Sequence, residues 1–183
     1  MTQVINLFGG SGSGKSTTAS LIYGQMKLSG HSVELVREWV KGMAWQGKVP
    51  TDIDQVYIFG KQCKLESELY GKVDWIVTDS PLILNAFYEL YYTKNIEDCV
   101  IQEAAIKFLK KVEKKGVKFH NFVLRRTKPY KKEGRFQTEK EANEIDLQIV
   151  KYLMDNNIHH TVIEEDDDNK AQAIVNKVLS RHP

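Results

Sequence analysis

The sequence predicts an α/β protein built on a parallel sheet with helices on both faces. Two observations predict it: short β-rich apolar runs alternate with segments of helical spacing, and chemically unusual residues follow the ends of those runs. Strands that alternate with helices are typical of parallel sheets, because the helical crossovers cover both faces. The length of 183 residues suits a single domain over 1–183 with a substantial buried core.

The first two strands frame the first helix. Residues 4–8 form a β-rich apolar run, and residues 16–28 carry apolar side chains at helical spacing until Gly30 ends the helix. A second strand is expected over 32–36. A polar, glycine-containing stretch follows at 41–50.

A helix over 51–69 begins with recognisable signals. Thr51 has the position of an N-cap, and Asp52 and Asp54 lie in the first turn. The apolar residues of this segment give an imperfect inner face, which we expect to consist of Val56, Phe59, Cys63 and Leu65.

The second half of the chain continues the alternation. The sequence DWIVTD at 74–79 predicts a third strand, which Pro81 closes. Further strands are expected over 120–124 and 160–164, and further helices over 82–92, 98–115, 139–156 and 169–180. The helix over 139–156 is expected to bury an apolar face formed by Ile145, Ile149, Leu153 and Met154.

Composition sets few limits on the partners of the chain. The formal net charge is only +2. Cys63 and Cys99 lie far apart without metal-binding spacing, so we expect reduced thiols and neither a disulfide nor a zinc site. No apolar run approaches the ~20 residues that span a bilayer, and the N-terminus does not resemble a secretory signal. These features favour a cytoplasmic protein without membrane contact.

The stretch GGSGSGKS at 9–16 follows the first strand and precedes the first helix. It matches G-x-x-x-x-G-K-[ST], the phosphate-binding loop, or Walker A motif. In such a loop, successive N–H groups and the helix N-terminus face an anion, while the lysine reaches the terminal phosphates and the hydroxyl ligates Mg²⁺. A glycine-rich linker is the alternative, which the flanking strand and helix disfavour. The expected nucleotide contacts are Gly9, Gly10, Ser11, Gly12, Ser13, Gly14, Lys15, Ser16 and Thr17.

Polar side chains follow each of the next strands as well. Glu38 follows the second strand, Asp79 the third, and Arg125 and Arg126 the fourth. In open α/β sheets, ligands bind beyond the carboxyl ends of the strands. These residues are therefore expected to share one site with the loop 9–16.

Asp79 ends the run WIVTD, where a Walker-B carboxylate holds Mg²⁺ directly or through water. The sequence Asp79-Ser80-Pro81 is also compatible with a helix N-cap. The two interpretations do not exclude each other. Because a phosphate loop occurs in the same chain, we favour the metal role, with Ser16 as the second ligand.

A basic stretch, LRRTKPYKKEGRFQTEKE, lies between the fourth strand and the helix over 139–156. Pro129 and Gly134 favour a structured lid at about 126–138 over a plain solvated loop. Arginines that close over a transferring phosphoryl group stabilise its charge and exclude water. The candidates are Arg125, Arg126 and Arg135. Contact with a nucleic-acid backbone is the alternative role for this basic stretch.

Glu38 is the candidate on the acceptor side. A carboxylate there can accept a hydroxyl proton as general base or orient the hydroxyl, although an exposed charge at a strand end is an equal alternative. Aromatic residues gather in the neighbouring segments, and one or two of them are suited to stack on a flat base or pyridine ring. They are Trp39, Trp45, Tyr57, Phe87, Tyr88, Tyr91 and Tyr92.

The acidic run 164–168 follows the last strand. Such runs are typical of exposed turns. We assign no role to this run, nor to His159 and His160, which lack the spacing of metal ligands.

With GGSGSGKS, VREW, IVTDSP and RRTKPYKKEGRFQ in place, the chain resembles the small P-loop kinases. More closely, it resembles P-loop kinases and ATPases of the ribosylnicotinamide-kinase-like AAA type, which include many short bacterial and phage-encoded members. The resemblance implies a P-loop NTPase three-layer sandwich with a five-stranded parallel sheet in the order 2-3-1-4-5. It also implies ATP with Mg²⁺ and an arginine-bearing lid.

On this pattern Lys15 and Ser16 take the phosphate and metal roles, Asp79 is the metal-linked carboxylate, and Glu38 lies on the acceptor side. The chain lacks a segment corresponding to the adenylyltransferase domain of some of these kinases. Its lid is also more basic than a riboside acceptor requires. A nucleotide, or a hydroxymethylated base within DNA, therefore stays open as the acceptor.

Three functions remain open at this point. The first is an ATP-dependent kinase that phosphorylates a nucleoside, nucleotide or riboside. The second is a kinase or ATPase that acts on nucleic acid, including modified DNA, through the basic stretch. The third is a nucleotide-binding switch without catalytic activity.

Overall fold

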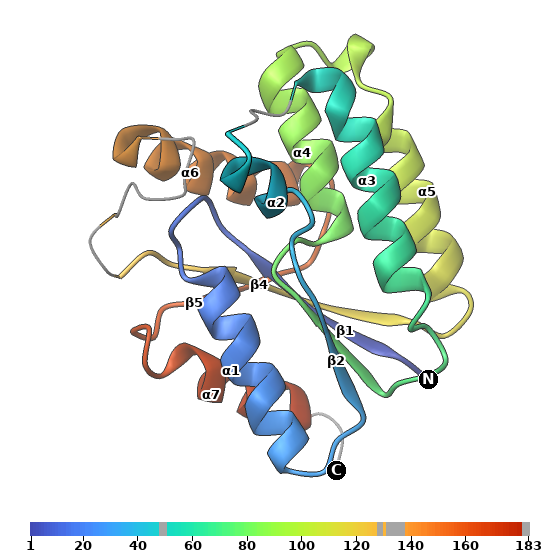
Figure 1. Cartoon of the computed structure of the whole chain (residues 1–183), viewed down its shortest axis with the longest axis vertical. Helices are drawn as coiled ribbons and strands as arrows, with labels where there is room; N and C mark the ends of the chain where they lie inside the picture. The colour runs from blue at the N-terminus through green and yellow to red at the C-terminus, as the bar shows by residue number, and fades with distance from the viewer. Residues whose placement is uncertain (48–50, 128–129, 131–137, 181–183) are drawn as a thin grey trace.

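A computed structural model of the chain describes residues 1–47, 51–127, 130 and 138–180. Five parallel strands form one sheet in the order β2-β3-β1-β4-β5, which confirms the predicted fold class and strand order (Figure 1). The strands are β1 Gln3–Phe8, β2 Val33–Val36, β3 Trp75–Thr78, β4 Lys118–Leu124 and β5 Thr161–Ile163.

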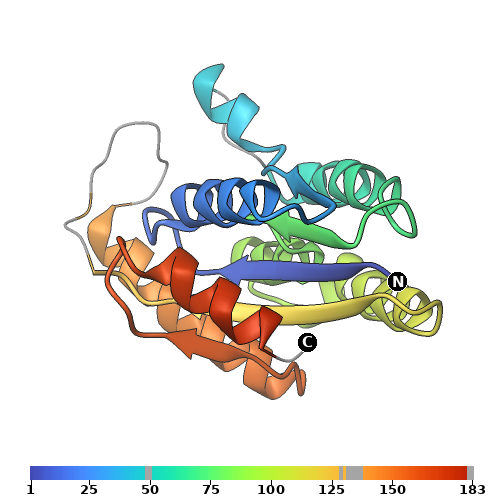
Figure 2. The ribbon, with the colours of Figure 1, turned by 90° about the horizontal axis from the view of Figure 1, so that it is seen from below.

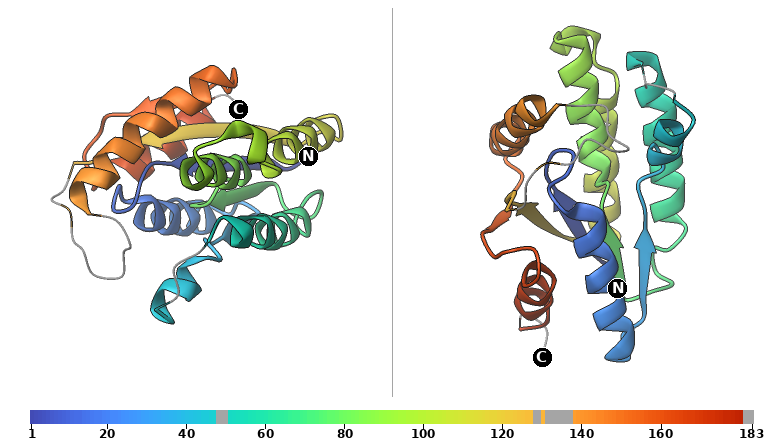
Figure 3. Two further views of the ribbon diagram at one scale, coloured as in Figure 1. Left: turned by 90° about the horizontal axis from the view of Figure 1, so that it is seen from above. Right: turned by 60° about the vertical axis from the view of Figure 1, so that its left-hand side comes forward.

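Helices cover both faces of the sheet (Figures 2 and 3). They are α1 Lys15–Leu28, α2 Lys41–Trp45, α3 Asp52–Ser67, α4 Leu82–Thr93, α5 Ile101–Glu113, α6 Glu139–Asp155 and α7 Lys170–Leu179, with the short 3-10 helix η1 at Ile96–Asp98. One face is covered by α1 and α7, and the other by α3, α4, α5 and α6.

Two apolar layers hold the sheet between the helices. On one face, strand residues such as Ile5 and Leu7 pack against Ile22 of α1 and Ile174 of α7. On the other face, Phe8 and its neighbours pack against α4, α5 and α6. Burial of a Leu or Ile side chain contributes roughly 1.5–3 kcal/mol, so these layers dominate the stability of the fold.

The register aligns the carboxyl ends of the strands at one edge. The last residues of β2 and β3, Val36 and Thr78, are paired, and so are the last residues of β4 and β5, Leu124 and Ile163. Phe8, at the end of β1, pairs with Val123 of β4. The residues that follow the strands therefore begin at a common edge.

Two helices that flank this edge start with the same cap. In α3 the Thr51 hydroxyl accepts from the backbone of Asp54, and the Asp54 carboxylate accepts from the backbone of Thr51. Thr138 and Glu141 form the same capping box at α6. A reciprocal cap satisfies two otherwise unpaired backbone donors, so both helix starts are well defined. The prediction of Thr51 as an N-cap is confirmed.

Within the polar stretch 41–50, the helix α2 forms at Lys41–Trp45 and projects from the body of the molecule (Figure 2). Two local predictions were wrong. In α3, Val56 and Leu65 are largely exposed. Met154 of α6 is exposed as well.

The cause of the α3 error is that its buried face is mostly polar. This face consists of Gln55, Ile58, Gln62 and Glu66, whereas the predicted Phe59 and Cys63 are only half-buried. For α6, Ile145, Ile149 and Leu153 are buried as predicted. Met154 follows Leu153 directly and is turned about 100° around the helix axis, away from the core.

Among the described residues, no helix combines the length and the apolar character needed to cross a membrane. Cys63 and Cys99 are free thiols, as expected.

Candidate functional site

The loop at residues 9–16, called the glycine loop here, joins β1 to α1. Gly9 has φ 144° and Gly14 has φ 92°, conformations that residues with a side chain rarely adopt. A Cβ atom on Gly9 would also lie 2.5 Å from Ser13 Oγ. Gly14 is the N-cap of α1, so the helix starts at Lys15 directly after the turn. The glycines thus serve the sharp strand-to-helix turn that the motif predicts.

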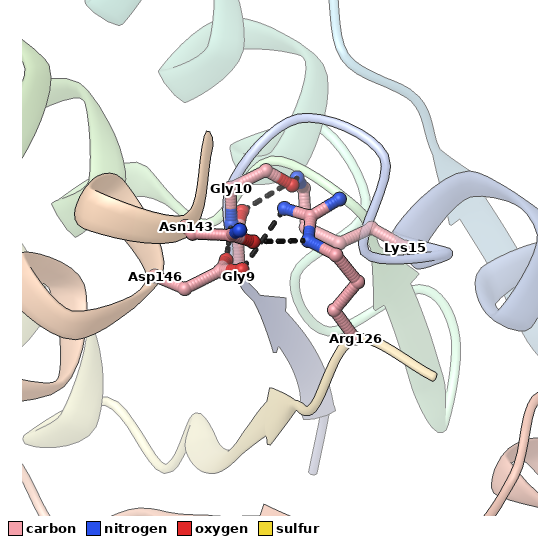
Figure 4. Close-up of polar contacts among 6 residues, drawn as sticks. All are labelled: Gly9, Gly10, Lys15, Arg126, Asn143 and Asp146. Carbon is pink, nitrogen blue, oxygen red and sulfur yellow. Dashed lines mark hydrogen bonds and ion pairs between the residues drawn. The ribbon is translucent and has the colours of Figure 1, made fainter. Parts of the chain in front are cut away.

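Lys15 folds back over the glycine loop. Its ammonium donates to the carbonyl oxygens of Gly9 at 2.6 Å and Gly10 at 3.0 Å (Figure 4). Removal of the ammonium from water lowers the pKa of Lys15, and this effect is opposed by Glu38, Asp79 and Asp146. Arg126 lowers the pKa further.

These influences show that side chains from several elements converge around the Lys15 ammonium. Glu38 follows β2, Asp79 follows β3, Arg126 follows β4 and Asp146 belongs to α6. The structure therefore brings together most of the residues that the strand-end argument placed in one site.

Asp79 is buried, with 4% of its surface exposed. Its Oδ1 accepts from the backbone N–H of Glu38 at 2.8 Å. The alternative role as a helix N-cap is wrong, because α4 begins at Leu82 with Pro81 as its cap residue and without a side-chain cap. The carboxylate instead joins the ends of β2 and β3.

The adjacent arginines point to different surroundings. Arg125 is 66% exposed and pairs with Glu164, with 2.5 Å between Nη1 and Oε2. The Arg126 side chain is only 11% exposed and pairs with Asp146, with 2.9 Å between Nη2 and Oδ2. Arg126 thus lies beside Lys15, whereas Arg125 lies at the surface with the acidic run.

Sequence reasoning missed the two partners of Arg126 on α6. Asp146 accepts from Arg126 and also from the backbone N–H of Gly10, and Asn143 Oδ1 accepts from Arg126 Nε at 3.1 Å (Figure 4). A signal for Asp146 was present in the sequence. It lies four residues after Ala142 and three before Ile149, so a carboxylate interrupts the apolar stripe of the helix.

The acidic run also contributes a residue near the glycine loop. Asp167 lies 3.7 Å from the position of a Cβ atom on Gly14. It pairs with Lys170, which is fully buried, and accepts from the Thr127 hydroxyl at 2.6 Å. The expectation of a plain exposed turn was therefore too simple at Asp167. The sequence signal that was overlooked is Lys170, a lysine three residues after Asp167.

The aromatic residues divide into two groups. Trp39 contacts the edge of Tyr57 with ring centroids 5.1 Å apart, while Trp45 is 75% exposed. Rings of α4 pack against one another and against Tyr152 of α6. Burial raises the pKa of Tyr88, and Glu38 raises it further, among other groups. This influence of Glu38 indicates that Tyr88 lies near the site.

Some predicted residues lie outside the described part of the chain. Arg135 belongs to this group, as does most of the predicted lid, including Lys131 and Lys132 of the basic stretch. Within the described ranges, no cluster of three or more His, Cys, Asp or Glu side chains forms a candidate metal site.

The fold and the glycine loop define the class as a P-loop kinase-like NTPase. The model of a family described as an AAA domain matches residues 4–170, so the chain belongs to this family. A search of the curated proteins finds no match. The closer likeness to ribosylnicotinamide kinases stays a prediction.

Solved structures share the fold at low sequence identity. A structure of deoxyadenosine kinase from M. mycoides with dCMP and a flexible dCDP bound is similar with a TM-score of 0.61 and 19% identity, over 97% of this chain and 99% of that chain. A structure of APS kinase from Mycobacterium tuberculosis with AMPPNP and APS is similar with a TM-score of 0.51 and 12% identity, over 97% and 98%.

Proposed function

We propose that the protein is an ATP-dependent kinase that transfers the γ-phosphoryl group to a nucleoside, nucleotide or riboside. The observation that carries the proposal is that Glu38, which follows β2, and Arg126, which follows β4, both act on the Lys15 ammonium. A passive nucleotide switch needs Lys15 to bind phosphate, but it does not need Glu38 and Arg126 together beside it. A kinase needs an acceptor-side carboxylate and a cation that stabilises the moving phosphoryl group.

The donor half of the site is the glycine loop with the first turn of α1. Its backbone N–H groups and the positive end of α1 suit the phosphates of ATP. Lys15, which donates to carbonyl oxygens of the loop, would exchange these hydrogen bonds for contacts to the terminal phosphates. Arg125 and Arg135 remain lid candidates that we assign a lesser role than Arg126.

The residues present fit a magnesium ion. Mg²⁺ prefers a few hard oxygen ligands together with waters and phosphate oxygens. Ser16 at the start of α1 and the buried carboxylate of Asp79 are the residues that would hold it. When bound, the ion would neutralise charge on the β- and γ-phosphates.

Glu38 is proposed to orient the acceptor. Asp79 holds the backbone of Glu38, so the carboxylate starts from a fixed position beside the phosphates. It would accept the proton of an attacking hydroxyl. Both of the structural neighbours described above were solved with small nucleotides, which supports a nucleoside-like acceptor over a macromolecule.

The test is the release of ADP from Mg-ATP across a panel of ribosides, deoxynucleosides, nucleoside monophosphates and modified DNA. One stimulating acceptor is expected among the small molecules, and Lys15→Ala serves as the blank because it removes the phosphate-binding ammonium. Stimulation by DNA alone would move the proposal to a nucleic-acid kinase. Tight ATP binding without turnover under any acceptor would leave only the switch. Retained turnover in Lys15→Ala would refute the role of the glycine loop.

A further inference from the structure

We propose that Asp146 and Asn143 are positioning residues that hold Arg126 over the phosphate site of the glycine loop. This inference rests on the proposed kinase function. Its starting point is that Arg126 is fixed through two of its three nitrogens. Nε donates to Asn143 Oδ1 at 3.1 Å, and Nη2 donates to Asp146 Oδ2 at 2.9 Å.

The third nitrogen, Nη1, has the character of a ligand-binding donor. It is buried and has no hydrogen-bond partner among residues 1–47, 51–127, 130 and 138–180. A buried donor without a partner costs about 1–3 kcal/mol, so such groups are rare unless a ligand satisfies them. A phosphate oxygen is the natural partner, because the guanidinium fork matches its geometry.

The same carboxylate joins Arg126 to the glycine loop. Asp146 Oδ1 accepts from the backbone N–H of Gly10, while Oδ2 accepts from Arg126 (Figure 4). A Cβ atom on Gly10 would lie 2.8 Å from the carbonyl oxygen of Ala142 and 2.9 Å from Asp146 Oδ1. The loop therefore lies directly on α6, and one side chain sets the distance between Arg126 and the loop.

Electrostatics places this pair beside the expected γ-phosphate. Arg126 and Asp146 both act on the Lys15 ammonium. Lys15 is the group expected to reach the terminal phosphates. Two cations next to each other are unfavourable without an anion, and Asp146 supplies part of that compensation. A bound triphosphate would supply the rest.

A purely structural role for Asp146 predicts different behaviour. If the carboxylate only fixed Gly10, its loss would disturb the loop whether or not Arg126 were present. If it positions Arg126, its loss has little further effect once Arg126 is absent. A double-mutant cycle separates the two roles, since it isolates the energy that depends on both side chains.

The experiment measures kcat, KM for ATP and the Kd of ATP for Asp146→Asn, Arg126→Ala and the double variant, with the acceptor that the panel identifies. We expect Asp146→Asn to lower kcat about 30-fold and to change KM for ATP less than about threefold, because the contact strengthens in the transition state. The double variant is expected to match Arg126→Ala within about twofold. Asp155→Asn, at an exposed residue in the last turn of α6, is the matched control and is expected to retain wild-type kcat.

Asn143→Ala provides a milder variant if Asp146→Asn folds poorly. It removes one hydrogen bond at an exposed residue, and kcat is expected to fall about fivefold, again only while Arg126 is present. Asp146→Asn and Asn143→Ala are each combined with Arg126→Ala. If the loss of kcat in either double variant equals the product of the two single losses, the positioning role is overturned. It is also overturned by an Arg126→Ala protein that equals the wild type in kcat, KM and Kd.

Failure of the kinase function is distinguishable from failure of this inference. A wild-type protein that binds ATP without turnover refutes only the kinase. The double-mutant cycle is then measured through the Kd of ATP. In the Arg126→Ala background, Asp146→Asn is expected to leave this Kd unchanged. An effect of equal size in both backgrounds would overturn the inference there as well.

Discussion

The two sides of the glycine loop are held in different ways. On the side of β4 and α6, one side chain binds another, and Asp146 joins Arg126 to the backbone of Gly10. On the side of β2 and β3, the Asp79 carboxylate accepts a hydrogen bond from the backbone N–H of Glu38. The first arrangement fixes the direction of a charge, whereas the second fixes the position of the chain. The proposed transition-state contact thus lies where side-chain geometry is most constrained.

Two helices, α6 and α3, also differ in what they bury. The buried face of α6 is apolar apart from the Tyr152 hydroxyl, which has no hydrogen-bond partner among the described residues. On α3, Gln62 and Glu66 are fully buried, and both amide atoms of Gln62 and Oε2 of Glu66 have no hydrogen-bond partner among the described residues. Unpaired buried polar groups cost stability. The described part of α3 thus buries three such unpaired atoms and that of α6 one, so burial of the α3 face costs more stability.

Asp79 offers the strongest test of the acceptor side. Asp79→Ala removes the contact to Glu38 and the proposed magnesium ligand together, so we expect kcat/KM to fall about a thousandfold, equal to about 4 kcal/mol. Asp79→Asn keeps an acceptor for the Glu38 N–H and is expected to lose less. Asp74→Asn, exposed before the start of β3, is the matched control. Equal activity of Asp79→Ala and the wild type would contradict both roles.

The buried Glu66 of α3 makes the stability of the protein depend on pH. Burial raises the pKa of Glu66 to about 7 from its ordinary value of 4.5, although the Tyr70 hydroxyl, which donates to Oε1 at 2.5 Å, opposes the shift. The folded state therefore retains a proton that the unfolded state has lost between these pH values. Stability is full below about pH 4.5 and falls as the pH rises through 7. The loss amounts to about 3 kcal/mol.

Glu66→Gln is expected to abolish this pH dependence, because the amide does not titrate. The free energy of unfolding, measured in denaturant at pH 5 and pH 8.5, should fall with pH more steeply in the wild type than in the variant. Glu68→Gln is the matched control on an exposed carboxylate, and it should keep the steep fall. Parallel pH profiles of the wild type and Glu66→Gln would show that Glu66 ionises normally.

Arg126 and Arg125 allow a buried and an exposed arginine of the predicted lid to be compared directly. Arg126→Ala is expected to lower kcat about 100-fold, because it removes the cation beside Lys15. Arg125→Ala, which breaks an exposed ion pair with Glu164, should change kcat less than about twofold. Steady-state kinetics of the two variants provides the test. The reverse order of effects would assign the lid role to Arg125.

The sequence predicted the fold and the strand-end residues because their signals are local. The glycine loop depends on glycine spacing, and Thr51 depends on a cap within one turn. Asp146 was missed because its partners, Gly10 and Arg126, are distant in the sequence and meet it only after folding. The inner face of α3 was missed because Gln62 and Glu66 are buried against the usual preference of polar side chains.

Glu38 gives the smallest expected effect. In phosphoryl transfer through a loose transition state, the attacking hydroxyl keeps its proton until late, so a carboxylate contributes more by orientation than by proton removal. We expect Glu38→Gln to lower kcat about tenfold, equal to about 1.4 kcal/mol, because the amide retains one oxygen that accepts a hydrogen bond. The Kd of ATP, measured by calorimetry, should stay within about twofold of the wild type, since Glu38 is proposed to face the acceptor.

The Asp79 variants show whether this effect depends on the position of the chain. Asp79→Ala releases the backbone of Glu38, so a second change, Glu38→Gln, should cost less in that background than in the wild type. A tenfold loss in both backgrounds would mean that Glu38 is positioned without Asp79. A loss of ATP affinity in Glu38→Gln would instead move Glu38 to the donor half of the site. The acceptor would then have to bind against another residue of the site, and Tyr88, on which Glu38 and Asp146 act, is the first candidate.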